Sequence, residues 1–301
     1  MTISVCIATH RRAERLAALL DDLAKQTLRP DEIVVVDNHA EGSARDVVER
    51  FRVRVPFPVH YEIQPERNIS LTRNRTVALA GGEWLAFVDD DERAPPEWLA
   101  RLFAATQRYE ADGVLAPVEP EVPDSAPAWI RAGKFYDFPH LPSGTVVPLN
   151  RMRFGNVILR GDRVRAESGP FDVRYGLVAG EDGDLLIRLV EHGAKVVWCD
   201  EAIVREPVES SRLRLRWLLM RALGGGQEFA RKTAAGRYGP ISRIGRVLFF
   251  CRALAQCLAA AILAAASLPF GRTGAARWLI KASANLGKMS IFWGSRYAEY
   301  A

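Results

Sequence analysis

The chain has 301 residues, of which 49% are apolar and 26% are charged, a composition typical of a folded globular protein and unlike that of a disordered or collagen-like chain. Its four cysteines are scattered without a CxxC pair, which argues against a disulfide framework or a zinc site and favours a reducing compartment. Residues 1–200 hold 25 Lys and Arg against 31 Asp and Glu, whereas residues 201–301 hold 16 against 5, so the net charge of +5 combines an acidic body of −6 with a basic tail of +11.

The first hundred residues alternate between short apolar runs and segments with helical spacing. The predicted strands are Ile3–Ala8, Ile33–Val36, Val59–Ile63 and Trp84–Val88, and the predicted helices are Glu14–Gln26, Ser43–Phe51, Leu71–Ala80 and Glu97–Tyr109. Strands that are apolar throughout and alternate with helices predict an α/β fold with a mostly parallel sheet covered on both faces.

Polar residues follow three of these strands. Thr9 ends the first, Asp37 the second, and Asp89–Asp91 the fourth. Ligands of open α/β sheets bind beyond the carboxyl ends of the strands. The three positions are therefore expected to converge on one site.

The chain becomes less regular after residue 110. Residues 117–153 are rich in proline and aromatic residues, which predicts a long loop or a small irregular insertion. Val157–Leu159 and Val196–Cys199 are predicted strands, and Asp182–His192 is a predicted helix that ends before Gly193.

The acidic triplet Asp89-Asp90-Asp91 is the strongest local signal. In an extended segment, Asp89 and Asp91 point to the same side and can share one hard cation. The alternative is an acidic turn that caps the next helix. Gly180-Glu181-Asp182, which precedes an apolar helical run, also has two interpretations. Asp182 is a general base, a helix N-cap, or both.

The ordered motifs resemble a known family. They are Ile3–Ala8 with Thr9, Val34–Asp37, Arg73-Asn74, Phe87–Asp91, Gly155-Asn156 and Gly180–Asp182. Over residues 1–210 this set resembles glycosyltransferase family 2, of the Rossmann-like GT-A fold. The tract from Glu206-Pro207-Val208 through Arg212, Trp217 and Arg221 further resembles bacterial exopolysaccharide glycosyltransferases of the succinoglycan type.

The resemblance implies an enzyme that inverts the anomeric carbon in a single displacement. It would move a sugar from a nucleoside diphosphate-sugar, with UDP as the expected nucleotide, to a hydroxyl of a saccharide or polyprenyl-linked acceptor. The implied cofactor is a divalent cation, Mg²⁺ or Mn²⁺, which neutralises the departing diphosphate.

The resemblance also assigns residues to roles. The nucleotide would contact Thr9, Asp37, Arg73, Asp89 and Asp90; the donor or acceptor sugar would contact Asn156, Glu181 and Arg212; the metal would bind Asp89, Asp91 and Glu206; and Asp182 would be the catalytic base. Many relatives carry a histidine after the last strand as a further metal ligand. This chain reads Val204-Arg205-Glu206 there, so either Glu206 replaces the histidine or the position is unused.

Residues 211–301 are predicted to form a separate basic and apolar helical extension after a catalytic domain of residues 1–210. Val247–Leu268 is almost entirely apolar, and Ala275–Trp293 mixes apolar and basic residues. We expect two helices that lie in or dip into a membrane surface, with a hairpin packed on the protein itself as the alternative. The N-terminus lacks the pattern of a secretory signal. The expected location is therefore the cytoplasmic face of the inner membrane, as a peripheral or monotopic protein.

Two other functions are compatible with parts of the sequence. A sugar nucleotidyltransferase also pairs a parallel sheet with acidic metal ligands, but it would carry a glycine-rich loop where this chain has Thr9-His10-Arg11-Arg12. A nucleic-acid-binding module could use the basic tail. The chain has no recognisable motif of that kind and its body is acidic, so no nucleic-acid partner is expected.

Overall fold

The computed structural model describes residues 1–176 and 180–293 and contains two compact units. The first consists of residues 1–120 and 138–206, and the second of residues 121–137 and 207–301. The proposed division at residue 210 did not assign the segment 121–137 to the C-terminal part. That segment carries a short helix, which packs on a C-terminal helix.

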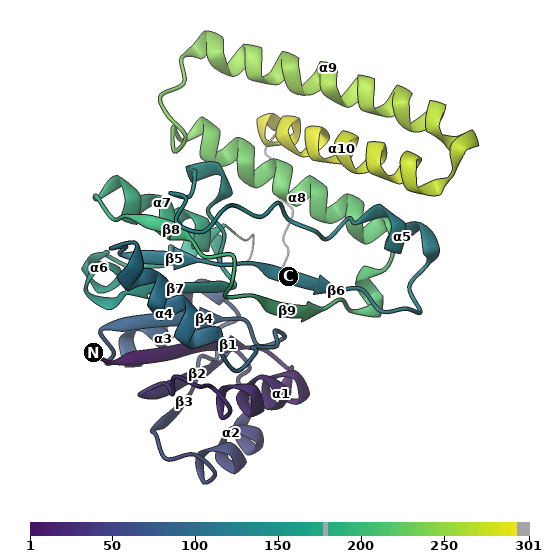
Figure 1. The fold of residues 1–301 in the computed structure, drawn as a ribbon. Helices are drawn as coiled ribbons and strands as arrows, with labels where there is room; N and C mark the ends of the chain where they lie inside the picture. Colours follow the sequence, from purple (N-terminus) through teal and green to yellow (C-terminus); the bar gives the residue numbers. More distant parts are fainter. Residues whose placement is uncertain (177–179, 294–301) are drawn as a thin grey trace. The chain divides into compact units, whose positions relative to one another are not determined.

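The first unit is built on a seven-stranded sheet (Figure 1). In spatial order the strands are β3 (Val59–Ile63), β2 (Glu32–Asp37), β1 (Ile3–Thr9), β4 (Trp84–Val88), β7 (Asn156–Arg160), β5 (Gly113–Leu115) and β8 (Val196–Trp198). All pairings are parallel except those of β7, which runs antiparallel to both β4 and β5. The expected mostly parallel sheet is confirmed.

Helices cover both faces of this sheet because alternate strand residues point to opposite sides. The helices of the first unit are α1 (Ala13–Leu23), α2 (Arg45–Arg52), α3 (Ile69–Leu79), α4 (Trp98–Arg108), α6 (Gly161–Ala166) and α7 (Glu181–Glu191). One set of strand residues, including Val5 and Val35, forms the main core with α1, α2 and α4. Helix α3 packs on β1 and β2. Phe87, from the alternate set, packs against Phe154 and Phe171.

The irregular region is more ordered than its composition suggested. It contains β6 (Val118–Glu121), α5 (Ala128–Gly133) and a 3-10 turn at Leu149–Arg151. Strand β6 pairs with β9 (Val204–Pro207) in a separate two-stranded sheet. These elements and β5 have at most six residues each, too few to show the periodicity on which the prediction depended.

The pair Gly81-Gly82 lies just beyond α3, which ends at Leu79 with an extended cap residue, Ala80. A side chain at Gly82 would collide with β1, because its Cβ would lie 2.6 Å from the backbone nitrogen of Ser4. The glycine is required by close packing between two chain segments, not by helix termination.

The second unit is helical. It consists of α5, α8 (Leu215–Ala234), α9 (Arg243–Ser267) and α10 (Arg272–Ser290), with short 3-10 turns at Ser210–Arg212, Leu268–Phe270 and Ile291–Trp293. Helix α10 packs against α5, α8 and α9. The backbones of α8 and α10 approach closely at two glycines. A Cβ on Gly226 would lie 2.0 Å from the Ala284 carbonyl oxygen, and one on Gly287 would lie 2.1 Å from that of Leu223.

Adjacent glycines in α8 provide a matched test of this packing. Gly226→Ala forces α8 and α10 apart and should lower the free energy of unfolding of the full chain by about 1–3 kcal/mol, as for overpacked cores. Gly225 has no atom within 4 Å of its Cβ position. Gly225→Ala should therefore be neutral or stabilise the protein by up to about 1 kcal/mol through helix propensity. Urea unfolding followed by circular dichroism measures both variants, and equal effects would contradict the close approach.

Candidate active site

The carboxyl ends of β1, β2 and β4 bring the predicted polar residues to one edge of the sheet. In the β1–β2 register, Thr9 lies opposite Asp37. The Thr9 hydroxyl donates a hydrogen bond of 2.7 Å to Oδ2 of Asp90, in the turn that follows β4. This convergence of Thr9 with the acidic triplet was expected from the strand order.

Two arginines balance the buried part of the triplet. Asp90 and Asp91 are buried, and Nη1 of Arg12 lies 3.1 Å from Oδ1 of Asp90 and 2.9 Å from Oδ2 of Asp91. Nη1 of Arg15 lies 3.5 Å from the same Asp91 oxygen. Burial raises the pKa of Asp90 to about 6, and the charge of Asp91 adds to this, whereas Arg12 opposes it. Sequence reasoning had given neither arginine a role.

Arg73 lies inside the unit between two acidic residues. Its Nη1 donates to Oε1 of Glu181 at 2.7 Å and its Nη2 to Oδ1 of Asp89 at 3.2 Å. The guanidinium also lies against the rings of Phe154 and Phe171, 5.1 and 5.8 Å from their centroids. Arg73 is 8% exposed and joins the end of β4 to the start of α7 through its pairs with Asp89 and Glu181. Its expected contact with the nucleotide stays a prediction.

Asp182 lies in the first turn of α7 and is partly exposed. Its carboxylate accepts hydrogen bonds from the backbone N–H groups of Gly183 at 2.6 Å and Phe154 at 3.3 Å. The N-cap of α7 is Gly180, with φ of 109°, so the interpretation of Asp182 as the cap is wrong. Loss of solvation raises the pKa of Asp89; Arg73 lowers it, and the charges of Asp91 and Asp182 raise it further. The charges of Asp91 and Asp182 therefore both act on Asp89.

Asp37 is held by the loop that follows β2. The residue is completely buried, and its oxygens accept hydrogen bonds from the backbone of His39 and Ala44 and from the hydroxyls of Ser43 and Tyr61. Asp37 therefore orders the loop that joins β2 to α2, and its expected contact with the nucleobase stays a prediction.

Asn156 connects several segments behind the site. It is 2% exposed. Its amide nitrogen donates to the carbonyl oxygens of Pro117 and Ala202, and its oxygen accepts from the indole N–H of Trp98. Asn156 thus ties β7 to two loops and to α4, and its expected contact with a sugar stays a prediction.

Glu92 is a site residue to which sequence reasoning gave no role, although it directly follows the acidic triplet. It is buried, and its carboxylate accepts the backbone N–H of Asp89 at 3.1 Å. Burial, followed by the charge of Asp89, raises its pKa well above the usual range. Gly155 lies beside it with φ of 110°, where a Cβ would come within 3.0 Å of the Glu92 carboxylate. Proximity to Glu92 thus explains the glycine of the Gly155-Asn156 motif.

The donor set fits a divalent cation that also binds a diphosphate. Among residues 1–176 and 180–293, no three histidine, cysteine or acidic side chains are already grouped as a metal site. Mg²⁺ in phosphate-binding sites is commonly held by one or two carboxylates together with phosphate oxygens and water. Asp89 and Asp91 could supply those two carboxylates. Glu206, in β9, lies near enough to Glu92 to raise its pKa, and its role as a ligand stays a prediction. Arg212 belongs to the second unit, where its guanidinium lies 5.6 Å from the Trp217 ring centroid, and its contact with a sugar also stays a prediction.

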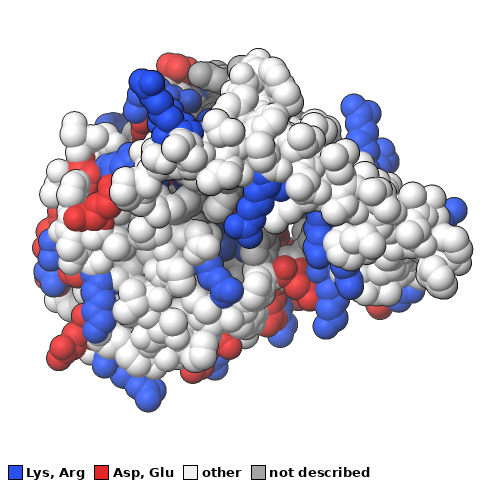
Figure 2. Space-filling model, turned by 90° about the horizontal axis from the view of Figure 1, so that it is seen from above, with Lys and Arg blue, Asp and Glu red and all other residues white. Residues whose placement is uncertain are grey.

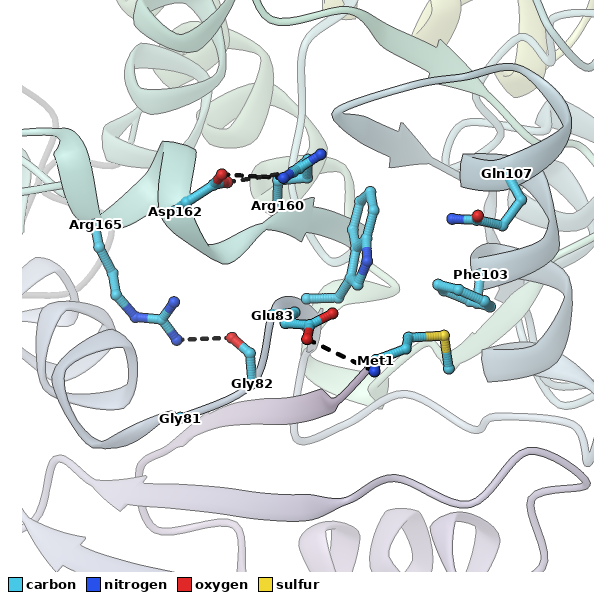
Figure 3. Close-up of a pocket in the computed structure, with 10 residues that line it drawn as sticks. Met1, Gly81, Gly82, Glu83, Phe103, Gln107, Arg160, Asp162 and Arg165 are labelled. Carbon is cyan, nitrogen blue, oxygen red and sulfur yellow. Dashed lines mark hydrogen bonds and ion pairs between the residues drawn. The ribbon is translucent and has the colours of Figure 1, made fainter.

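A cavity of about 470 Å³ lies elsewhere in the first unit (Figure 3). It is lined at the amino ends of β1 and β4 by Met1 and Trp84, and at the end of antiparallel β7 by Arg160. Its charged groups pair locally: Arg160 with Asp162 at 3.1 Å, and the amino terminus with Glu83 at 3.6 Å. The cavity is therefore at the edge of the sheet opposite the acidic residues, and we assign it no part in the chemistry.

Comparison with protein families and known proteins agrees with this arrangement. Residues 4–149 match the family described as glycosyl transferase family 2. The chain is 34% identical over 241 residues to the succinoglycan biosynthesis protein ExoM of Rhizobium meliloti, covering 79% of this chain and 77% of that protein. It is 25% identical over 241 residues to the glucosyl-dolichyl phosphate glucuronosyltransferase of Haloferax volcanii, covering 75% of each.

Solved structures confirm the GT-A fold. The mannosyltransferase PcManGT from Pyrobaculum calidifontis, in complex with GDP-mannose and Mn²⁺, superposes with a TM-score of 0.65 at 18% identity, covering 97% of this chain and 87% of that one. TarS of S. aureus, residues 1–349 in complex with UDP-GlcNAc, superposes with a TM-score of 0.57 at 16% identity, covering 98% and 93%. At these identities the likeness concerns the fold alone.

Neighbouring arginines on α3 test the structural role of Arg73. Arg73→Met removes the guanidinium from between Asp89 and the buried Glu181, and should lower the free energy of unfolding by about 3–5 kcal/mol. Arg75 makes a bidentate pair with Glu62 at the surface, so Arg75→Met should cost less than about 1 kcal/mol. Urea denaturation measures the free energy of unfolding of both variants. Equal losses would show that the interior pairs of Arg73 stabilise the protein no more than the surface pair of Arg75.

Proposed function

Because this chain belongs to glycosyltransferase family 2, we propose that it transfers a sugar from a nucleoside diphosphate-sugar to an acceptor hydroxyl with inversion at the anomeric carbon. The chain is a glycosyltransferase of polysaccharide or glycan biosynthesis. UDP is the proposed nucleotide. The UDP and UDP-GlcNAc complexes of TarS support it, whereas the GDP-mannose complex of PcManGT represents the competing choice.

One observation carries the proposal: Arg73 joins the acidic end of β4 to the acidic start of α7, although the two segments are distant in the chain. Asp89 and Asp91 follow β4, and Asp182 lies in the first turn of α7. Arg73 pairs with Asp89 and with Glu181, the neighbour of Asp182. Such an arrangement can provide both a cation site and a proton acceptor.

In the proposed mechanism, Asp89 and Asp91 hold a divalent cation, Mg²⁺ or Mn²⁺, and Asp182 is the base. When bound, the cation neutralises charge that develops on the departing diphosphate. Asp182 removes the proton from the acceptor hydroxyl as its oxygen attacks the anomeric carbon, so that inversion follows from a single displacement. The backbone N–H groups of Gly183 and Phe154 orient the Asp182 carboxylate, and Glu181, held by Arg73, lies beside it.

The second unit supports a proposed membrane location. Among the described residues, the one helix long and apolar enough to cross a bilayer is Arg243–Phe270, with a mean hydropathy of 2.1 over its most apolar 18 residues, of which 17% are buried. Helix α9 turns Ala253, Ala260 and Ala264 inward. The large apolar side chains that it exposes are Ile244, Val247, Leu248, Leu254, Leu258, Ile262 and Leu263.

Charge favours the same partner. Neither α9 nor α10 contains an aspartate or glutamate, and Figure 2 shows a band of uncharged residues flanked by Lys and Arg on the side where α9 lies in Figure 1. Basic residues near an anionic leaflet contribute about 1 kcal/mol each. We therefore propose attachment to the cytoplasmic face of the membrane, next to a saccharide acceptor carried on a polyprenyl lipid.

Replacing the proposed base tests the mechanism. Asp182→Asn keeps the shape of the side chain but cannot accept a proton, so turnover should fall by roughly two orders of magnitude or more. Release of nucleoside diphosphate, measured over a panel of nucleotide-sugars and acceptors, gives the rate. Donor affinity, measured by calorimetry in the presence of Mn²⁺, should change little. A variant with near wild-type turnover would remove Asp182 from the role of base.

Polar substitutions on the exposed face of α9 test the membrane location without shortening the chain. The triple variant Leu248→Gln, Leu258→Gln, Ile262→Gln changes side chains that are 63%, 57% and 69% exposed. It should fold normally but lose much of its sedimentation with anionic liposomes. Each leucine or isoleucine that the membrane buries contributes about 1.5–3 kcal/mol to the free energy of binding. Val53→Gln, at an 85% exposed position in the first unit, is the control. A wild-type chain that stays in the supernatant would overturn the membrane location but not the catalytic proposal.

A further inference from the structure

The placement of Arg12 has a consequence for how the site takes up a cation. The Oδ2 atom of Asp91 is 2.9 Å from Nη1 of Arg12 and 3.5 Å from Nη1 of Arg15. Asp91 is buried, whereas the side chains of Arg12 and Arg15 are 35% and 33% exposed. A divalent cation that binds this oxygen must therefore either displace the guanidinium of Arg12 or share the oxygen with it. The guanidinium has room to move towards solvent.

The start of α1 is an unusual place for these charges. Arg12 is the N-cap residue of α1, Arg15 lies in its first turn together with the acidic Glu14, and no side chain caps the helix. Positive charge at a helix N-terminus is unfavourable, because the free N–H groups there already carry partial positive charge. Asp90 and Asp91 compensate for the charge of the arginines. When a cation binds Asp91, part of the positive charge of Arg12 and of the N-terminus of α1 is no longer neutralised, and another anion can bind there.

Asp90 limits how far Arg12 can move. Its Oδ1 accepts from Nη1 of Arg12 at 3.1 Å, and its Oδ2 is fixed by the Thr9 hydroxyl at 2.7 Å. An arginine that loses Asp91 but keeps Asp90 stays at the edge of the site. A diphosphate is a strong partner for a guanidinium and for a helix N-terminus.

We propose that Arg12 is a resident counter-cation of Asp91, which competes with the divalent cation and transfers to the donor diphosphate when the cation binds. Arg12 is in this sense a positioning residue. It weakens cation binding in the absence of a diphosphate, and it strengthens binding when the diphosphate is present, so that cation and donor bind cooperatively. The inference rests on the proposed function, since it requires the cation to bind at Asp91.

Titration of the full-length protein with Mn²⁺ by calorimetry, with and without UDP, tests the inference. Arg12→Gln should tighten Mn²⁺ binding roughly fivefold or more without UDP and should reduce the gain in Mn²⁺ affinity that UDP produces. Arg15→Gln, which removes the longer contact, should have a smaller effect in the same direction. Arg11→Gln makes the same change of charge one residue away, at an exposed position whose backbone N–H bonds to Ser43, and should leave both affinities close to those of the wild type.

The outcomes separate this inference from the function on which it rests. Asp91→Asn should abolish Mn²⁺ binding. If it does, and Arg12→Gln binds Mn²⁺ no more tightly than Arg11→Gln, the counter-cation role of Arg12 is overturned and the metal site stands. If Asp91→Asn binds Mn²⁺ as the wild type does, the proposed metal site fails and the role of Arg12 fails with it. Tighter binding in Arg12→Gln together with a smaller effect of UDP supports the inference, because a merely structural role for Arg12 would weaken both.

Discussion

The candidate site depends on one buried guanidinium. Arg73 donates to Asp89, which follows β4, and to Glu181, which begins α7. These segments are about ninety residues apart in the chain, and the sheet alone does not fix the distance between them. An arginine suits this position because its planar fork presents several donors in fixed directions. Phe154 and Phe171 lie against the guanidinium, and its pair with the buried Glu181 is shielded from water, which strengthens it.

The same edge of the sheet concentrates more negative charge than a protein interior tolerates without compensation. Asp89, Asp90 and Glu92 all have raised pKa values, and in each case burial is the largest cause. Arginines compensate at different depths: Arg73 from within and Arg12 from the surface. Arg12 is partly exposed whereas Arg73 is buried, so Arg12 has room to move away when another cation arrives and Arg73 does not.

The helical unit follows a different physical rule. Its helices pack through glycine and alanine: the backbones of α8 and α10 meet at Gly226 and Gly287, and α9 turns Ala253, Ala260 and Ala264 inward. Small residues permit close contact between helices, and they leave the large apolar side chains of α9 facing outward. A face of that kind requires a partner, and the absence of acidic residues from α9 and α10 favours an anionic surface.

The sequence by itself determined the parts of this protein that depend on local pattern. Apolar runs and helical spacing predicted the strands and helices of the first hundred residues, and the order of the elements predicted that Thr9 and the acidic triplet would meet. Tertiary structure decided which polar side chains stay available. Asp37 ends one strand and Asn156 begins another at the expected edge. The oxygens of Asp37 bind the loop that follows it and Tyr61 of β3, and the amide of Asn156 binds two loops from elsewhere in the chain. Arg12, Arg73 and Glu92 acquire their roles only from partners brought close by folding. A residue type and its position on a strand can be read from local sequence, but burial and hydrogen-bond partners are set by long-range contacts.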